Sequence, residues 1–256
     1  MRQFDEAIEV TQASGRRLVI SPMTQADVEP LAALYRAIQI GREVYLRALD
    51  PHAPGNFERK GGMFQIHNPE SLARLLDDES EYVWVIRDGG RLLGAFWCGL
   101  TDEKYTDSSR VRPYPGSEDL PQRIARGMSE KTLYFSKEIL IAPDERGGAL
   151  AEALIYAGMR FFHAKGYRES CGEIYYVHAF QDAQGLHPVR LFNGASYRML
   201  KHTGCRLEGA FPQCVVNADG FDVVLSIRIV RWEIQSALPK TRDFLSAKGM
   251  SMEAPA

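Results

Sequence analysis

The sequence lacks the features of a membrane-bound, secreted or nucleic-acid-binding protein. No apolar run approaches the ~18 residues of a membrane-spanning helix, and residues 1–10 lack the charged and then apolar layout of a secretory signal. The formal net charge of -2 over 256 residues gives no long-range attraction for nucleic acid or an anionic membrane. We therefore expect neither of them as a partner.

Cysteine is also scarce, with four residues and no C-x-x-C pair. Without a secretory signal, such a set indicates free thiols in a reducing cytoplasm rather than a disulfide framework. Neither these thiols nor the six histidines show the spacing of metal ligands. We expect a cytoplasmic protein without a metal site, and its 45% hydrophobic and 25% charged residues are typical of a globular chain.

The stretch 138–157 is the most informative part of the chain. The short apolar run 139–142 is typical of a buried strand, and Pro143 ends it because proline has no N–H to donate. A turn with charged residues and glycines follows at 144–148. From Ala149 onward, apolar residues recur in two rows at helical spacing, which predicts a helix lying across a sheet.

A strand that leads through glycines into a helix N-terminus is a potential anion site. The first N–H groups of the helix have no intrahelical partner, and the macrodipole adds positive charge there. Gly147 and Gly148 permit close approach of a phosphate, and Arg146 adds a guanidinium fork that matches phosphate oxygens. The absence here of G-K-[ST] and of G-x-G-x-x-G excludes a P-loop and a dinucleotide fingerprint. We interpret residues 143–151, the anion loop, as a pyrophosphate site.

The anion loop resembles the acetyl-CoA loop of the GCN5-related N-acetyltransferases, V-x-P-x-x-[RQ]-x-x-G-x-[GA]. The pattern runs here from Ile141, in place of Val, to Ala151, and Arg146 matches. Ala149 departs from the family's usual glycine, and its methyl group would crowd a pyrophosphate unless the neighbouring glycines let the loop shift. An ordinary strand–turn–helix with a surface arginine is the alternative interpretation of this motif alone.

A second segment, 193–205, resembles the family's other signature, N-x-x-S-x-x-x-Y-x-x-x-G-F. The residues in register are Asn193, Ser196 and Gly204, while Cys205 replaces the phenylalanine. Two degenerate motifs in the right order, separated by room for a helix, a strand and a second helix, support the family more strongly than either one. The resemblance covers roughly 18–232.

The resemblance implies an α/β fold, a central mixed sheet flanked by helices, with the acyltransferase domain at 18–232. Residues 1–17 and 233–256 would be N-terminal and C-terminal extensions. The polar segment 102–130 would be an insertion before the central strand. It is either a lid that selects an acidic or phosphate-bearing substrate or a solvated decoration. The loop 50–69 either helps to bind the acceptor or is a plain connection.

Local patterns predict the elements in a compatible order. Strands are expected at 17–20, 82–86, 92–100, 131–142, 171–180, 207–216 and 221–231. Helices are expected at 28–38, 41–49, from 69 onward, at 149–165, 189–202 and 234–247, the last interrupted by Pro239. Segment 181–188 is expected to be a loop, because Pro188 suits the first turn of a helix.

In this family the two central parallel strands splay apart, and the pantetheine arm of acyl-CoA fills the gap. The resemblance therefore implies acetyl-CoA, or another acyl-CoA, as co-substrate. The residues implied to contact it are Ile139, Ile141, Arg146, Gly147, Gly148, Ala149, Leu150, Ala151, Asn193 and Ser196.

Direct attack on the thioester by an amine requires a base and a means for the thiolate to leave. Glu138 and Glu173 are the candidate bases, each equally compatible with a surface or ion-paired carboxylate, and Glu138 is preferred. Leu200 stands where the family often has a tyrosine donor, so Tyr197, one turn away, is the candidate donor. For the remaining candidate bases a structural role is favoured; they are His178, His187 and His202.

The sequence thus predicts an N-acetyltransferase that acts on a primary amine of a small molecule or peptide, as a possible homodimer. The alternative is a non-catalytic acyl-CoA-binding module of the same fold with a regulatory or assembly role. The departures at Ala149 and Leu200 are the features that favour this alternative.

Overall fold

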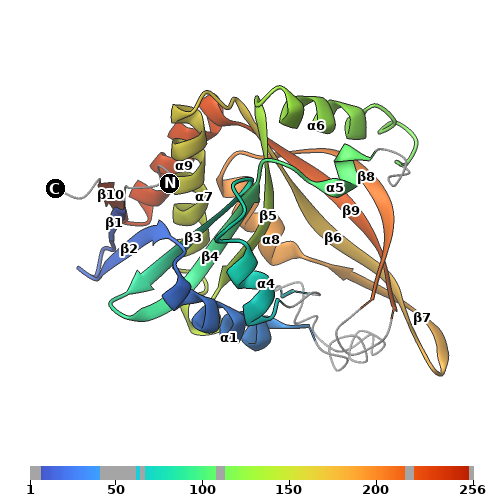
Figure 1. Cartoon of the computed structure of the whole chain (residues 1–256), viewed down its shortest axis with the longest axis horizontal. Helices are drawn as coiled ribbons and strands as arrows, with labels where there is room; N and C mark the ends of the chain where they lie inside the picture. Colours follow the sequence, from blue (N-terminus) through green and yellow to red (C-terminus); the bar gives the residue numbers. More distant parts are fainter. Residues whose placement is uncertain (1–6, 41–61, 64–66, 108–112, 217–221, 254–256) are drawn as a thin grey trace.

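The computed structural model describes residues 7–40, 62–63, 67–107, 113–216 and 222–253, which form one mixed sheet with helices on both faces (Figure 1). The strands are β1 (Ile8–Thr11), β2 (Arg17–Pro22), β3 (Glu81–Asp88), β4 (Arg91–Gly99), β5 (Leu133–Ile141), β6 (Glu169–Asp182), β7 (Gly185–Phe192), β8 (Arg206–Val216), β9 (Asp222–Glu233) and β10 (Ser251–Glu253). Their order is β10-β1-β2-β3-β4-β5-β6-β9-β8, with β7 also paired to β6. The mixed α/β class expected from the sequence is confirmed.

Seven α-helices are described, together with two short 3₁₀ helices (Gln25–Asp27 and Pro143–Glu145). The α-helices are α1 (Val28–Ile38), α4 (Pro69–Arg74), α5 (Glu103–Thr106), α6 (Leu120–Ser129), α7 (Leu150–Ala164), α8 (Gly194–His202) and α9 (Ile234–Ala247). Within the described ranges, no helix is long and apolar enough to cross a membrane.

Alternate residues of the central strands bury two different cores. Trp84 and Phe96 pack in the cluster that contains the apolar residues of α7 and α9. Val85 and Ala95, their neighbours in β3 and β4, pack with α1. Because neighbouring residues of a strand point to opposite faces, α7 and α1 cover opposite faces of the sheet. The helix α6 lies on the α1 side, since Phe135 packs with it.

The parallel strands β5 and β6 separate halfway along. Their register runs from Leu133 opposite Glu169 to Ser136 opposite Gly172, and no pairing follows. Beyond that point β5 continues beside β4 as far as Ile141, while β6 pairs with β7 from Tyr176 onward. The sheet therefore opens a gap between Ser136 and the end of β5, as the family resemblance implied.

The segment 181–192 corrects one expectation. The predicted loop 181–188 and the start of the predicted helix 189–202 are instead the turn and second strand of a β-hairpin, and α8 begins only at Gly194. Val189 and Leu191 are buried on either side of exposed Arg190, which is a period of two. Pro188 is tolerated because β7 is an edge strand, where a missing N–H leaves no ladder bond unmade.

The predicted extensions and insertion contribute to the sheet and to its core. The strand β1 pairs with β2 on one side and β10 on the other, so the two ends of the described chain meet. Pro239 lies inside α9, which continues past it to Ala247. The insertion contains α5 and α6, and its buried residues, Tyr105, Leu120, Ile124 and Met128, belong to the second core cluster. The helix predicted at 41–49 lies outside the described residues, as does most of the loop 50–69.

Candidate functional site

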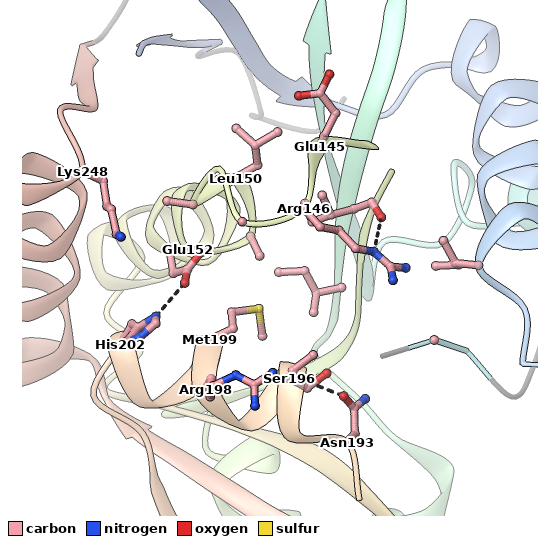
Figure 2. A pocket seen from close by; sticks show the side chains of 18 of the residues that line it. Glu145, Arg146, Leu150, Glu152, Asn193, Ser196, Arg198, Met199, His202 and Lys248 are labelled. Atoms are coloured by element: carbon pink, nitrogen blue, oxygen red, sulfur yellow. Dashed lines mark hydrogen bonds and ion pairs between the residues drawn. The ribbon is translucent and has the colours of Figure 1, made fainter. Parts of the chain in front are cut away.

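A cavity of about 320 Å³ lies between the end of β5, the N-terminus of α7 and one side of α8 (Figure 2). Its far wall comes from α1 and from Met63, whose N–H donates to the carbonyl of Ile38 at 3.1 Å. All the predicted acyl-CoA contacts except Gly148 line it; they are Ile139, Ile141, Arg146, Gly147, Ala149, Leu150, Ala151, Asn193 and Ser196. The two sequence motifs therefore meet in one place.

The anion loop reverses the chain between β5 and α7 through two left-handed residues. Gly147 has a φ of 88° and Ala149 a φ of 60°. Ala149 is the N-cap of α7 and provides no side-chain cap. The first N–H groups of α7 therefore point toward the cavity without a capping oxygen, and this is the geometry that binds anions at helix N-termini.

We expect Ala149→Gly to stabilise the protein by roughly 0.5–1 kcal/mol. An L-residue in the left-handed region costs about 1–2 kcal/mol, which glycine avoids, although the more flexible unfolded chain offsets part of the gain. Urea denaturation measures the change. Ala153→Gly, in the interior of α7, is the matched control and should lose about 1 kcal/mol. Equal destabilisation by both substitutions would contradict a strained N-cap at Ala149.

Basic side chains face the cavity from three directions. Arg146 extends from the anion loop, Arg198 from α8 and Lys248 from the end of α9 (Figure 2). Arg146 is half-buried, donates through Nε to the carbonyl of Ile141 at 3.4 Å, and has its pKa lowered by burial. A guanidinium presents a planar fork of N–H donors that matches phosphate oxygens, so this wall of the cavity suits a phosphate-bearing ligand.

The two carboxylates that line the cavity both contact basic side chains. Glu145 accepts two hydrogen bonds from Arg16, at 2.8 and 3.0 Å. Glu152, in the first turn of α7, contacts Nδ1 of His202 at 3.0 Å, and the ring of His202 stacks on Phe244. The ion pair of Glu145 with Arg16 reduces the negative charge that an incoming anion would meet.

The side chain of Asn193 explains the spacing between Asn193 and Ser196 in the second motif. Its side-chain Oδ1 accepts from the N–H of Ser196 at 3.0 Å and so caps α8. The cap fixes the entry of the chain into α8 at the point where Ser196 reaches the cavity. Both residues thus hold the α8 wall in place beside the gap.

Glu138 lies on the α1 side of the sheet, next to the cavity-lining Ile139. The hydroxyl of Tyr35 donates to its Oε2, and Nε2 of His67 lies 3.3 Å from its Oε1. The ring of His67 is in edge contact with Tyr35 and with Trp97, at centroid distances of 4.9 and 5.1 Å. This group, which we call the Glu138 cluster, gathers residues from α1, β4, β5 and the segment before α4.

Solved structures provide the comparison that decides the fold. RimJ of Mycobacterium smegmatis, in complex with CoA-disulfide, has a TM-score of 0.54 at 15% identity, with 97% of each chain covered. The chain has the GCN5-related N-acetyltransferase fold. An N-acetyltransferase from Staphylococcus aureus Mu50 has a TM-score of 0.49 at 15% identity, covering 85% of this chain and 98% of its own.

A ribosomal-protein-alanine N-acetyltransferase from Brucella melitensis has a TM-score of 0.48 at 14% identity, covering 84% of this chain and 98% of its own. No protein-family model matches the sequence, and no curated protein is similar enough to count as a match. The chain is therefore similar to known acetyltransferases in its fold, and the sequence comparisons add no match.

Glu173, the other predicted base, occupies a separate site on the acetyltransferase sheet. Its Oε1 accepts from Nζ of Lys104 at 2.6 Å and from the hydroxyl of Tyr105 at 2.7 Å, both from α5. Its side chain is 6% exposed. A carboxylate held by a lysine and a tyrosine is better placed to anchor α5 to β6 than to accept a substrate proton.

The remaining predicted candidates lie outside the cavity or are held by other residues. Tyr197 packs against Phe192 at a centroid distance of 5.7 Å and is not among the lining residues, and Leu200 is buried in the α7 core. His178 contacts Ser226, and His187 contacts Asp182. The Tyr197 side chain is thus placed against Phe192 rather than in the cavity lining, and its role as thiolate donor stays a prediction.

The sequence did not single out Tyr35 or His67 as functional. Tyr35 matched the apolar stripe of α1, and it is buried there as expected. His67 lies within the loop 50–69, for which the sequence left acceptor binding and a plain connection equally open, and this was the one available signal.

Proposed function

We propose that the protein is an acyl-CoA-dependent N-acyltransferase that transfers acetyl from acetyl-CoA to a primary amine of a small molecule or peptide. The observation that carries the proposal is the cavity itself. It joins the open edge of β5 to the uncapped N-terminus of α7 and to the basic side chains Arg146, Arg198 and Lys248. This combination suits a ligand with an extended amide-containing arm and phosphates.

The pantetheine arm would lie along Ile139 and Ile141, the part of β5 beyond its pairing with β6. On that edge the backbone N–H and C=O groups face the gap, and a ligand amide can satisfy them. The pyrophosphate would lie on the first turn of α7, with Arg146 beside it. Support for such a ligand in this fold comes from RimJ, whose structure contains CoA-disulfide.

The acceptor would approach from the α1 side of the sheet, which is the face toward which the Glu138 side chain points. Its ammonium must lose a proton before the nitrogen can attack the thioester carbonyl. The C–N bond forms, the C–S bond breaks, and the sulfur leaves with the electron pair. Because a thiolate is a good leaving group near neutral pH, the lack of a tyrosine donor at Leu200 does not prevent transfer.

A thermal shift with acetyl-CoA and CoA tests the proposal. A ligand at a hundred times its dissociation constant adds about 2.7 kcal/mol, which for a chain of this size raises the melting temperature by roughly 5–10 °C. Thiol release during incubation with a panel of primary amines then tests turnover. No shift with acetyl-CoA, CoA or longer acyl-CoAs would contradict the proposal. A shift without thiol release for any amine would favour a non-catalytic binding module.

A further inference from the structure

Both oxygens of the Glu138 carboxylate are already engaged within the protein. Oε2 accepts from the Tyr35 hydroxyl and Oε1 contacts Nε2 of His67 at 3.3 Å. Tyr35 is 1% exposed, and burial, reinforced by the charge of Glu138, raises its pKa well above the ordinary value. Tyr35 therefore stays a hydroxyl donor. Glu138, with a side chain only 12% exposed, is poorly placed to take a proton from a substrate directly.

His67 is more accessible than Glu138 or Tyr35. Its side chain is 22% exposed, and the edge contacts with Tyr35 and Trp97 fix the plane of its ring. The cluster adjoins the cavity, because Ile139, next to Glu138 in β5, and Ile38, one turn after Tyr35 in α1, both line it. The imidazole is thus held against Glu138 in a cluster that adjoins the cavity.

The contact with Glu138 determines how His67 can act. An ionised carboxylate only accepts hydrogen bonds, so the imidazole nitrogen that faces it must carry the proton. Neutral His67 is then the Nε2–H tautomer, and its lone pair is on Nδ1. A carboxylate that orients an imidazole and stabilises its protonated form is the established way to make a histidine an effective base.

We propose that His67 is the residue that takes the acceptor's proton and that Glu138 is its positioning residue. This inference rests on the proposed function. Nδ1 of His67 removes one proton from the ammonium, and the freed electron pair of the nitrogen forms the C–N bond as the C–S bond breaks. The second proton of the nitrogen goes to the departing thiolate, which yields CoA and the amide, and His67 returns its proton to solvent.

The other charged groups around the ring are paired. Lys137 forms an ion pair with Glu81 and lies 5.2 Å from the indole ring of Trp97. Among the described residues, Glu138 is the charged group in direct contact with the His67 ring.

Kinetics of thiol release separate the role of His67 from that of Glu138. The acceptor is an amine from the panel or, if no amine reacts, water. We expect His67→Ala and His67→Gln to lower kcat by about 10²–10⁴, while calorimetry finds the acetyl-CoA affinity unchanged within about threefold. Glu138→Gln should retain more activity than either, with an altered pH profile. If Glu138→Gln abolishes turnover and His67→Gln is nearly neutral, Glu138 is the base and the inference is overturned.

A nitrogen NMR measurement on histidine-labelled protein needs no acceptor. We expect the neutral His67 ring to be the Nε2–H tautomer, and Glu138→Gln to change the tautomer balance. A dominant Nδ1–H tautomer in the unsubstituted protein would overturn the inference. Failure of the proposed function would appear separately, as absence of acetyl-CoA binding in the calorimetry.

Discussion

Arg146→Glu is expected to weaken acetyl-CoA binding by at least about 100-fold. A hydrogen bond to a charged group contributes roughly 1.5–3 kcal/mol, and the substituted carboxylate adds repulsion toward a pyrophosphate. The effect is large because Arg146 is half-buried at the cavity wall, where water screens charge less than at the surface. Isothermal titration calorimetry measures the change.

Arg160→Glu is the matched control for this reversal. Arg160 is exposed near the C-terminal end of α7, where it lies over the ring of Tyr156. The same change of charge there should alter acetyl-CoA affinity by less than about threefold. Equal losses at both positions, or no loss at Arg146, would contradict the assignment of the anion loop.

Asp27→Ala is expected to cost about 3–5 kcal/mol of stability, as removal of one partner from a buried ion pair does. Asp27 immediately precedes α1, and its side chain is 6% exposed. It accepts from the N–H and the hydroxyl of Thr24, each at 2.7 Å, and from two nitrogens of Arg87. Without Asp27, Arg87 and the turn before α1 lose their shared acceptor.

Urea denaturation with Glu70→Ala as control separates this effect from that of a surface pair. Glu70 pairs with Arg74 at 2.5 Å, but both side chains are about three-quarters exposed, at 74% and 75%, and such a pair contributes at most about 1 kcal/mol. A loss below that value for Asp27→Ala would show that the buried pair does not anchor α1.

Asp27 also makes the stability of the protein depend on pH. Burial alone would raise the pKa of Asp27, but the hydrogen bonds from Arg87 and Thr24 outweigh it, and the pKa is lowered. The stabilisation is therefore fully present above the unfolded pKa of about 4 and is lost as pH falls through the lower folded pKa. Stability of Asp27→Ala should fall less steeply below about pH 4 than that of the unsubstituted protein.

Local patterns in the sequence were sufficient to predict the strand–loop–helix unit around Arg146. Its signals lie within twenty consecutive residues: an apolar run, Pro143, two glycines and a helical repeat. The same kind of reasoning failed at Val189–Phe192. Four residues after a proline are too few to separate a period of two from the start of a helix, and pairing with β6 decided the outcome.

The Glu138 cluster could not be predicted in this way. Tyr35 and His67 are 103 and 71 residues from Glu138, and no periodic pattern connects them. Tyr35 falls on the apolar stripe of α1, where a purely structural residue would also lie. Only the packing of α1 across β5 brings its hydroxyl to a carboxylate, and that packing depends on the whole sheet.

The central claim is that acyl-CoA binds between β5 and the N-terminus of α7. Hydrogen–deuterium exchange with and without acetyl-CoA tests this claim most directly. We predict slower exchange at the amides of 139–141 and 147–152, because the ligand would occupy the open edge of β5 and the first N–H groups of α7. Binding that protects other amides and leaves these two segments unchanged would contradict the account.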